Sequence, residues 1–247
     1  IFLKISNFIY THMHSFLLSK IDVGSHLYVN FSESLHLHAE TIFVSTLVVT
    51  AVCLFLILGT RDLNKVPGDS QNILEVVYDL VKSIAVTQMG PSYYSQFLPF
   101  VATIFLFVLG SNVAGALIPW KLIEIPSGEL AAPTNDINTT ACLAILTSIA
   151  YFFAGLKIKG LGFFKRYIKP AVFFLPLNIV EDFSKPLSLN FRLFGNVVAD
   201  ELTVAVICSL VPILIPLPVM MLGLFASCLQ ALIFATLAAA YIGEVIE

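Results

Sequence analysis

Charged residues are scarce in this chain. Lys, Arg, Asp and Glu together make up 12% of its 247 residues, whereas a soluble domain usually carries about 25%. The net charge of −3 is small and no basic stripe is present, which argues against nucleic-acid binding. Hydrophobic residues make up 58% and the mean hydropathy is +0.92. This composition predicts a polytopic membrane protein, in which each charge inside an apolar run is informative.

Reactive motifs are also missing. The four cysteines lie in apolar runs without a CxxC spacing or an adjacent histidine: Cys53, Cys142, Cys208 and Cys228. We interpret them as small core residues. No nucleophile triad, phosphate-binding loop or metal-ligand set is found. We therefore predict no metal site, no cofactor and no catalytic centre in this chain.

Long apolar runs predict five transmembrane helices, because a bilayer core needs about 20 consecutive apolar residues. The predicted spans are 39–58, 97–119, 140–156, 171–211 and 217–245. Prolines cluster between the last two spans, which predicts a turn and a C-terminal helical hairpin. We thus predict an all-α polytopic membrane protein that forms one membrane domain over residues 1–247.

Two segments differ from the spans. Residues 71–89 repeat apolar side chains at three- and four-residue spacing with charges off that stripe, which predicts an amphipathic helix. Such a helix either lies along the membrane surface or packs beside the bundle. Residues 1–30 are expected to form an N-terminal arm that is either interfacial or only partly ordered, because the apolar stretch over residues 1–19 is short and interrupted by histidines.

Basic residues indicate the orientation. The loop over residues 157–170 carries five Lys or Arg residues and no acid. An excess of basic residues marks the cytoplasmic or equivalent side of a membrane. Alternation of the spans then places the C-terminus on this side, and the N-terminus and the 121–138 loop on the other.

Arg192 interrupts an otherwise apolar stretch, and Asp200 and Glu201 follow on the same predicted helix. A guanidinium in hydrocarbon costs at least ~2.5 to 3.5 kcal/mol on insertion scales, so it is rarely kept there without a function. An arginine and carboxylates inside one transmembrane helix predict an ion-translocation site.

Helix geometry separates these charges. Glu201 lies nine residues after Arg192, which corresponds to half a turn round the helix and ~13 Å along its axis. Two polar routes, one near each residue, are therefore feasible. Folding the hairpin near residue 212 brings Gln230 to the depth of Arg192, where its amide oxygen can meet the guanidinium, and places Gly223 opposite Glu201.

The hairpin motifs resemble a known family. LNIVEDFSKPLSLNFRLFGNVVADEL and LQALIFATLAAAYIGE are similar to subunit a of the F-type ATP synthases, and the plastid and cyanobacterial form is the most similar. GLGFFKRYIKP upstream and the amphipathic segment also match. The resemblance covers residues 30–247 and is most specific over residues 176–245.

This resemblance implies a mechanism. Arg192 matches the obligatory arginine that separates two offset half-channels, and Glu201, Asn196 and Gln230 match positions that line the proton-uptake path or support the arginine. The implied partners are the ring of c subunits, each with one carboxylate, the peripheral-stalk b-type subunits and the lipid bilayer. The family also has a long and steeply tilted C-terminal hairpin. ATP chemistry is then expected in other chains.

Further polar residues are weaker candidates for the half-channels: Asp200, Asp182, Glu181, Ser188 and Asn190. Asp200 serves either the path or the structure. Glu181 and Asp182 form either a solvated cluster with Lys185 or the mouth of the release path. Asn196 and Gln230 have an alternative role as amides that pack helices.

Two other functions compete with the stator channel. A self-contained ion or proton transporter would use Arg192 and Glu201 as a gate, and would work as a single chain. A structural subunit would use the charges only for helix pairing. The resemblance favours the stator channel in a plastid thylakoid membrane, with the N-terminus lumenal and the C-terminus stromal.

Overall fold

The structure is a computed structural model. It describes residues 28–32, 35–61, 64, 67–117, 124–125, 128–129, 132–164, 167, 175–210 and 216–246. The predicted N-terminal arm, 1–30, lies almost entirely outside the described residues. So does the predicted turn between the last two spans, around residues 211–215.

The described residues are predominantly helical, as the composition predicts. The long helices are α2 (Ala39–Thr60), α3 (Asp69–Met89), α4 (Tyr94–Leu117), α5 (Ile137–Lys159), α7 (Leu175–Leu210) and α8 (Pro216–Ile246). Two 3-10 segments, η2 (Pro133–Asn135) and η3 (Gly160–Phe164), flank α5. Two short antiparallel pairs were not predicted: β1 (Tyr28–Ser32) with β2 (Leu35–His38), and β3 (Glu124–Ile125) with β4 (Gly128–Glu129).

Four helices in the described part of the chain are long and apolar enough to cross a membrane. These segments are Thr41–Thr60, Tyr94–Ala116, Ile137–Lys159 and Leu217–Ile246. Helix α7, which carries six charged side chains over its 36 residues, is not among the segments found in the described part of the chain. The fifth crossing through α7 therefore stays a prediction.

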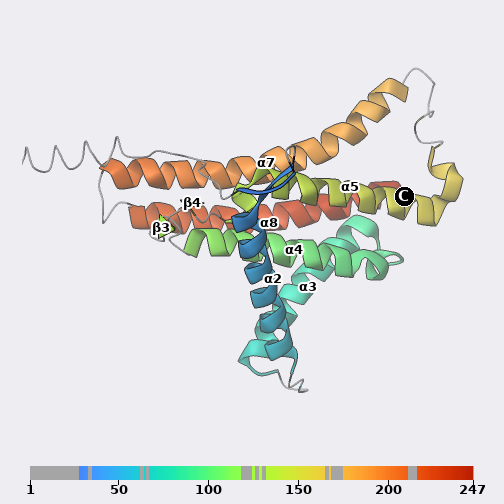
Figure 1. The fold of residues 1–247 in the computed structure, drawn as a ribbon. Coiled ribbons are helices and arrows are strands. Elements are labelled where there is room, and N and C mark those ends of the chain that lie inside the picture. Colours follow the sequence, from blue (N-terminus) through green and yellow to red (C-terminus); the bar gives the residue numbers. More distant parts are fainter. Residues whose placement is uncertain are drawn as a thin grey trace, which may run out of the picture.

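The helices form a bundle around α8, which packs against α3, α4, α5 and α7. Figure 1 shows α4, α5, α7 and α8 running side by side, while α2 crosses them steeply. The amphipathic helix α3 packs on this bundle through Val81, Ala85 and Met89, and its opposite side exposes Ile73 and Val76. Helix α3 thus packs beside the bundle, and its placement relative to the membrane surface stays a prediction.

Small residues let α8 approach its neighbours closely. Its buried side carries Ala231, Ala235 and Ala239. A Cβ atom at Gly243 would lie 2.0 Å from the carbonyl oxygen of Gln88 in α3, and one at Gly155 of α5 would lie 2.4 Å from Val245 Cγ1. Close backbone contact of this kind is typical of helix packing in membranes.

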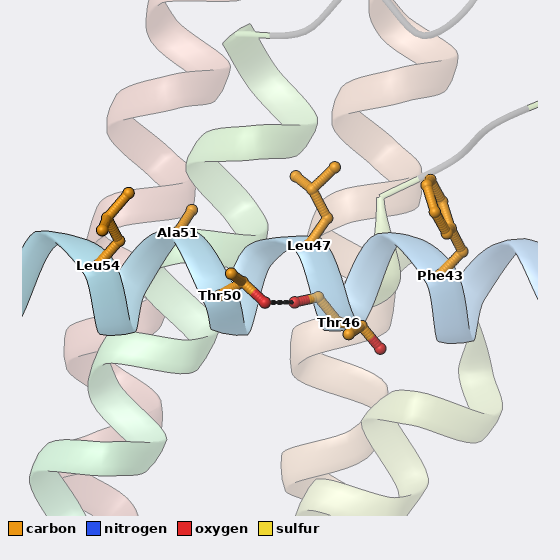
Figure 2. A pocket seen from close by; sticks show the side chains of 6 residues that line it. All are labelled: Phe43, Thr46, Leu47, Thr50, Ala51 and Leu54. Atoms are coloured by element: carbon orange, nitrogen blue, oxygen red, sulfur yellow. Dashed lines mark hydrogen bonds between the residues drawn. The ribbon is translucent and has the colours of Figure 1, made fainter.

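The outer side of α2 is largely apolar, and the hydroxyl groups on it hydrogen-bond to carbonyls of the same helix. A shallow hollow of about 390 Å³ lies on it, lined only by α2 side chains: Phe43, Thr46, Leu47, Thr50, Ala51 and Leu54 (Figure 2). The Thr50 hydroxyl donates to the Thr46 carbonyl at 2.7 Å. Its polar atoms are thus satisfied within the helix, as a lipid-facing surface requires.

Candidate functional site

Arg192 lies on the outer side of α7, and its side chain is exposed. Its guanidinium donates a long hydrogen bond of 3.5 Å to the hydroxyl of Ser188, one turn earlier. The exposed side chains nearby on α7 include the large and apolar Phe191 and Leu187, and the residues one turn away on either side are the small Ser188 and Gly195. Arg192 is therefore a cation set in an apolar surface that no described residue covers.

Gln230 of α8 is only 5% exposed, and its amide nitrogen is buried without a hydrogen-bond partner among the described residues. The predicted hydrogen bond between Gln230 and Arg192 is not formed in the described part of the chain. Equal depth on two helices does not bring side chains together when they point in different directions. Arg192 points outward, whereas Gln230 points into the bundle. Asn196 is half-buried on α7, and its role stays a prediction.

Glu201 contacts the segment before α5. Asn135 of η2 donates from Nδ2 to Glu201 Oε2 at 2.7 Å. The next residue, Asp136, is buried and accepts hydrogen bonds from the Thr41 hydroxyl at 3.2 Å and the Asn138 amide at 2.9 Å. A line of polar groups thus runs from α7 through η2 to the start of α2.

Sequence reasoning missed Asn135, Asp136 and Thr41. The available signal was Asp136 immediately before an apolar helix, which is a common N-cap. Its cap role is present, because its side chain accepts from the Asn138 backbone amide. The hydrogen bond between Asn135 and Glu201 joins residues 66 positions apart. A local sequence pattern cannot predict a contact between residues so far apart in the chain.

Asp200, rather than Glu201, lies opposite Gly223. A Cβ atom at Gly223 would lie 3.4 Å from Asp200 Cγ, and the Ser227 hydroxyl donates to Asp200 Oδ2 at 3.5 Å. The prediction that Glu201 faces Gly223 is therefore wrong. Counting residues from the hairpin turn predicts how deep a residue lies along its helix. It does not predict which way the side chain points, and adjacent helical residues point about 100° apart.

The direction follows from the packed face of α7. Leu189, Leu193 and Val197 are buried at steps of four residues, and Asp200 continues this stripe. Helix α4 also reaches this region, because Asn112 donates from Nδ2 to the Ser227 carbonyl at 3.1 Å. Asp200 thus lies where α7 and α8 meet, close to α4.

Lys185 gathers the charges near the start of α7. Its ammonium group lies 2.8 and 3.0 Å from the two carboxylate oxygens of Glu244 on α8. Glu181 lies 3.3 Å and Asp182 3.7 Å from the same nitrogen. Asp182 is 7% exposed and also accepts a short hydrogen bond from the Tyr167 hydroxyl. Asp182 therefore belongs to a packed ion-pair network, whereas the side chain of Glu181 remains exposed.

Asn190 is buried on α7, and its Oδ1 atom has no partner among the described residues. Ser188 contacts Arg192. Among the described residues, neither the Ser188 nor the Asn190 side chain hydrogen-bonds to Glu181, Asp182, Lys185 or Glu244. No group of three or more metal-ligating side chains occurs among the residues that the structure describes.

Together these residues form two polar clusters along α7 with Arg192 between them. The Glu181–Asp182–Lys185 cluster precedes Arg192 along the helix, and the Asp200–Glu201 cluster follows it. The residues of the two clusters are about 10 to 17 Å from Arg192 along the helix axis at the usual rise per residue. The arrangement defines a helical integral membrane protein in which an outward-facing arginine lies between two separate polar regions along one helix.

Comparisons with known proteins agree with this class. Residues 42–243 match the family described as ATP synthase A chain. The chain is 55% identical over 232 residues to the chloroplastic ATP synthase subunit a of Stigeoclonium helveticum, covering 94% of each chain. It is 56% identical over 230 residues to the chloroplastic ATP synthase subunit a of Oedogonium cardiacum, covering 93% of this chain and 91% of the relative. The chain belongs to the family of ATP synthase A chains.

Proposed function

We propose that the chain carries protons through two offset half-channels that Arg192 separates. As a subunit a of an F-type ATP synthase in a plastid membrane, it is the stator side of the proton channel and works against the ring of c subunits. Asp200 and Glu201 belong to the uptake half-channel, with Asn196 and Gln230 beside it. Glu181, Asp182, Ser188 and Asn190 belong to the release half-channel.

The observation that carries this proposal is the position of Arg192. Its side chain is exposed on an apolar side of α7, with separate carboxylate clusters before and after it along the helix. A fixed cation stabilises the ionised form of a carboxylate that passes it, so an incoming ring carboxylate releases its proton there. The same cation prevents direct proton flow between the clusters. Each charge that crosses is worth ~2.3 kcal/mol per 100 mV, which a leak would lose.

The uptake half-channel extends beyond the predicted residues. The contacts from Glu201 to Asn135, and from Asp136 to Thr41, support a polar route from α7 toward the start of α2. Carboxylates can take up and release protons through water, and amides that hydrogen-bond to them orient the carboxylates and the water. Asp200, Ser227 and Asn112 supply a second polar group on the α8 side of this route.

The membrane arrangement is part of the proposal. Helix α7 has 36 residues and α8 has 31, about 54 and 46 Å at the usual rise. A hydrocarbon core is ~30 Å thick, so both helices would cross it at a steep slant as the fifth span and its hairpin partner. The N-terminus is lumenal and the C-terminus is stromal in the thylakoid membrane.

The chain itself is non-catalytic in this proposal, and other chains of the complex perform the ATP chemistry. The apolar outer sides of α7 and α8, with Arg192 among them, support contact with the c ring. The b-type subunits of the peripheral stalk are further partners.

Replacement of Arg192 by Ala tests the proposal. In sealed thylakoid membranes with the assembled complex, we expect ATP-driven proton pumping to be lost. The passive proton leak should persist or rise after the catalytic head is removed. Arg61→Ala is the matched control, because Arg61 is an exposed arginine just after the end of α2. Near-normal pumping with Arg192→Ala would contradict the separator role.

A further inference from the structure

The ion pair between Lys185 and Glu244 joins two helices, unlike the other ion pairs of Lys185 in the described part of the chain. Glu181 and Asp182 precede Lys185 by one turn on α7, so their attraction acts within one helix. Glu244 belongs to α8, and both of its oxygens accept from the Lys185 ammonium group, at 3.0 and 2.8 Å. The ring of Tyr241, one turn before Glu244, lies 5.6 Å from the same nitrogen. The Lys185 side chain is only 10% exposed.

The α8 end of this pair is firmly held. Gly243, next to Glu244, packs against the backbone of Gln88 in α3 so closely that a Cβ atom would overlap it. Val245 and Ile246 are buried. Glu244 is therefore presented from a fixed part of the bundle.

The α7 end lies at a weak point of the helix. Pro186 follows Lys185 inside α7, and proline cannot donate the backbone hydrogen bond to the carbonyl four residues earlier. Figure 1 shows α7 bent rather than straight, and proline is a usual cause of such a bend. An external contact next to Pro186 can thus set how the two parts of α7 are oriented.

Arg192 lies seven residues after Lys185, two turns along and on nearly the same side of α7. A change in orientation at Lys185 would therefore shift Arg192 relative to α8. Resting on the proposed function, we propose that Glu244 is a positioning residue, whose ion pair with Lys185 holds the Arg192-bearing side of α7 in register with α8.

Replacement of Glu244 by Gln isolates the link. Lys185 keeps two carboxylates on its own helix, so no buried cation is left unpaired. We measure the coupling ratio, defined as protons pumped per ATP hydrolysed, in sealed membranes and per assembled complex. Because Glu244 is partly exposed, we expect a fall of about two- to fivefold, with a raised passive leak. Asp79→Asn, an exposed acid on α3, should match the parent.

Pair-preserving variants separate positioning from general damage. Lys185→Arg retains a cation that can bind Glu244 and should keep most of the coupling ratio. Glu244→Asp retains the charge on a shorter side chain and should give an intermediate ratio. If Glu244→Gln does not accumulate, the positioning role is tested by whether the coupling ratio of Glu244→Asp is lower than that of Lys185→Arg.

Two results would overturn the inference: parental coupling and leak in Glu244→Gln, or a loss with Lys185→Arg as large as with Glu244→Gln. Membranes with Arg192→Ala are measured in parallel. Normal pumping there contradicts the proposed function, whereas normal coupling in Glu244→Gln alone contradicts only the positioning role.

Discussion

Asn135 donates a hydrogen bond of 2.7 Å to the Glu201 carboxylate and so joins the 3-10 turn before α5 to the last third of α7. This contact places an amide beside a carboxylate that is central to the proposed uptake half-channel. It also connects Glu201 to Asp136, the next residue in the turn, and through it to Thr41 of α2. The proposed uptake half-channel therefore draws on three separate segments.

Loss of the Asn135 amide should slow proton uptake. Asn135→Leu removes the donor to Glu201, and a hydrogen bond to a charged group is worth about 1.5 to 3 kcal/mol. We expect the initial rate of ATP-driven pumping to fall roughly tenfold or more, with normal amounts of complex. Asn72→Ala, at an exposed position on α3, is the control. Unchanged pumping in Asn135→Leu would show that this contact is only structural.

The space beside Asp200 should be limited at Gly223. A Cβ atom there would lie 3.4 Å from Asp200 Cγ, so Gly223→Ala should be tolerated after a small shift. Gly223→Leu should displace Asp200 and its partner Ser227 and abolish most pumping, because overpacking typically costs ~1 to 3 kcal/mol. Pumping in native membranes measures the difference. Gly162→Leu, at an open and exposed site, should have no effect. Equal activity of Gly223→Ala and Gly223→Leu would disprove the close approach.

Gly243 should be intolerant even of alanine. The added Cβ would lie 2.0 Å from the Gln88 carbonyl oxygen, and a backbone atom of a packed helix cannot rotate away. We expect Gly243→Ala to reduce the amount of assembled complex severalfold and to lower the melting temperature of the complex that still assembles. Native gels and thermal inactivation provide the measurements. Gly68→Ala, where nothing lies within 4 Å, should behave as the parent. Full accumulation of Gly243→Ala would mean that α3 and α8 are further apart.

The Thr41 hydroxyl should stabilise the start of the bundle. It donates to the buried Asp136 carboxylate, so Thr41→Val removes a contact between α2 and the N-cap of α5. The expected loss is about 1 to 2 kcal/mol in the free energy of unfolding, seen as a lower inactivation temperature. Thr46→Val is matched chemically, since that exposed hydroxyl binds only a carbonyl of its own helix. If both variants lose the same stability, the contact with Asp136 contributes nothing.

Much of the membrane architecture could be predicted from hydropathy and periodicity. The described helices are long and apolar where the sequence predicts spans, and α3 is amphipathic. Helix α7 is the exception, since the fifth span that the apolar run at 171–211 predicts is not among the spans found in the described residues. The roles of Arg192, Glu201, Asn196 and Gln230 in proton transfer stay predictions, because a lone chain contains neither the ring nor a proton path in operation.

The sequence by itself determined which segments are apolar, where the interior charges lie along the chain and which family the hairpin motifs belong to, because these features are local. Only the tertiary structure decided that Asp200 rather than Glu201 faces Gly223, that Glu201 meets Asn135, and that Lys185 pairs with Glu244. Such contacts depend on the rotation and depth of one helix against another. Those are set by how small residues such as Gly223 and Gly243 let whole helices pack, and no single segment contains that information.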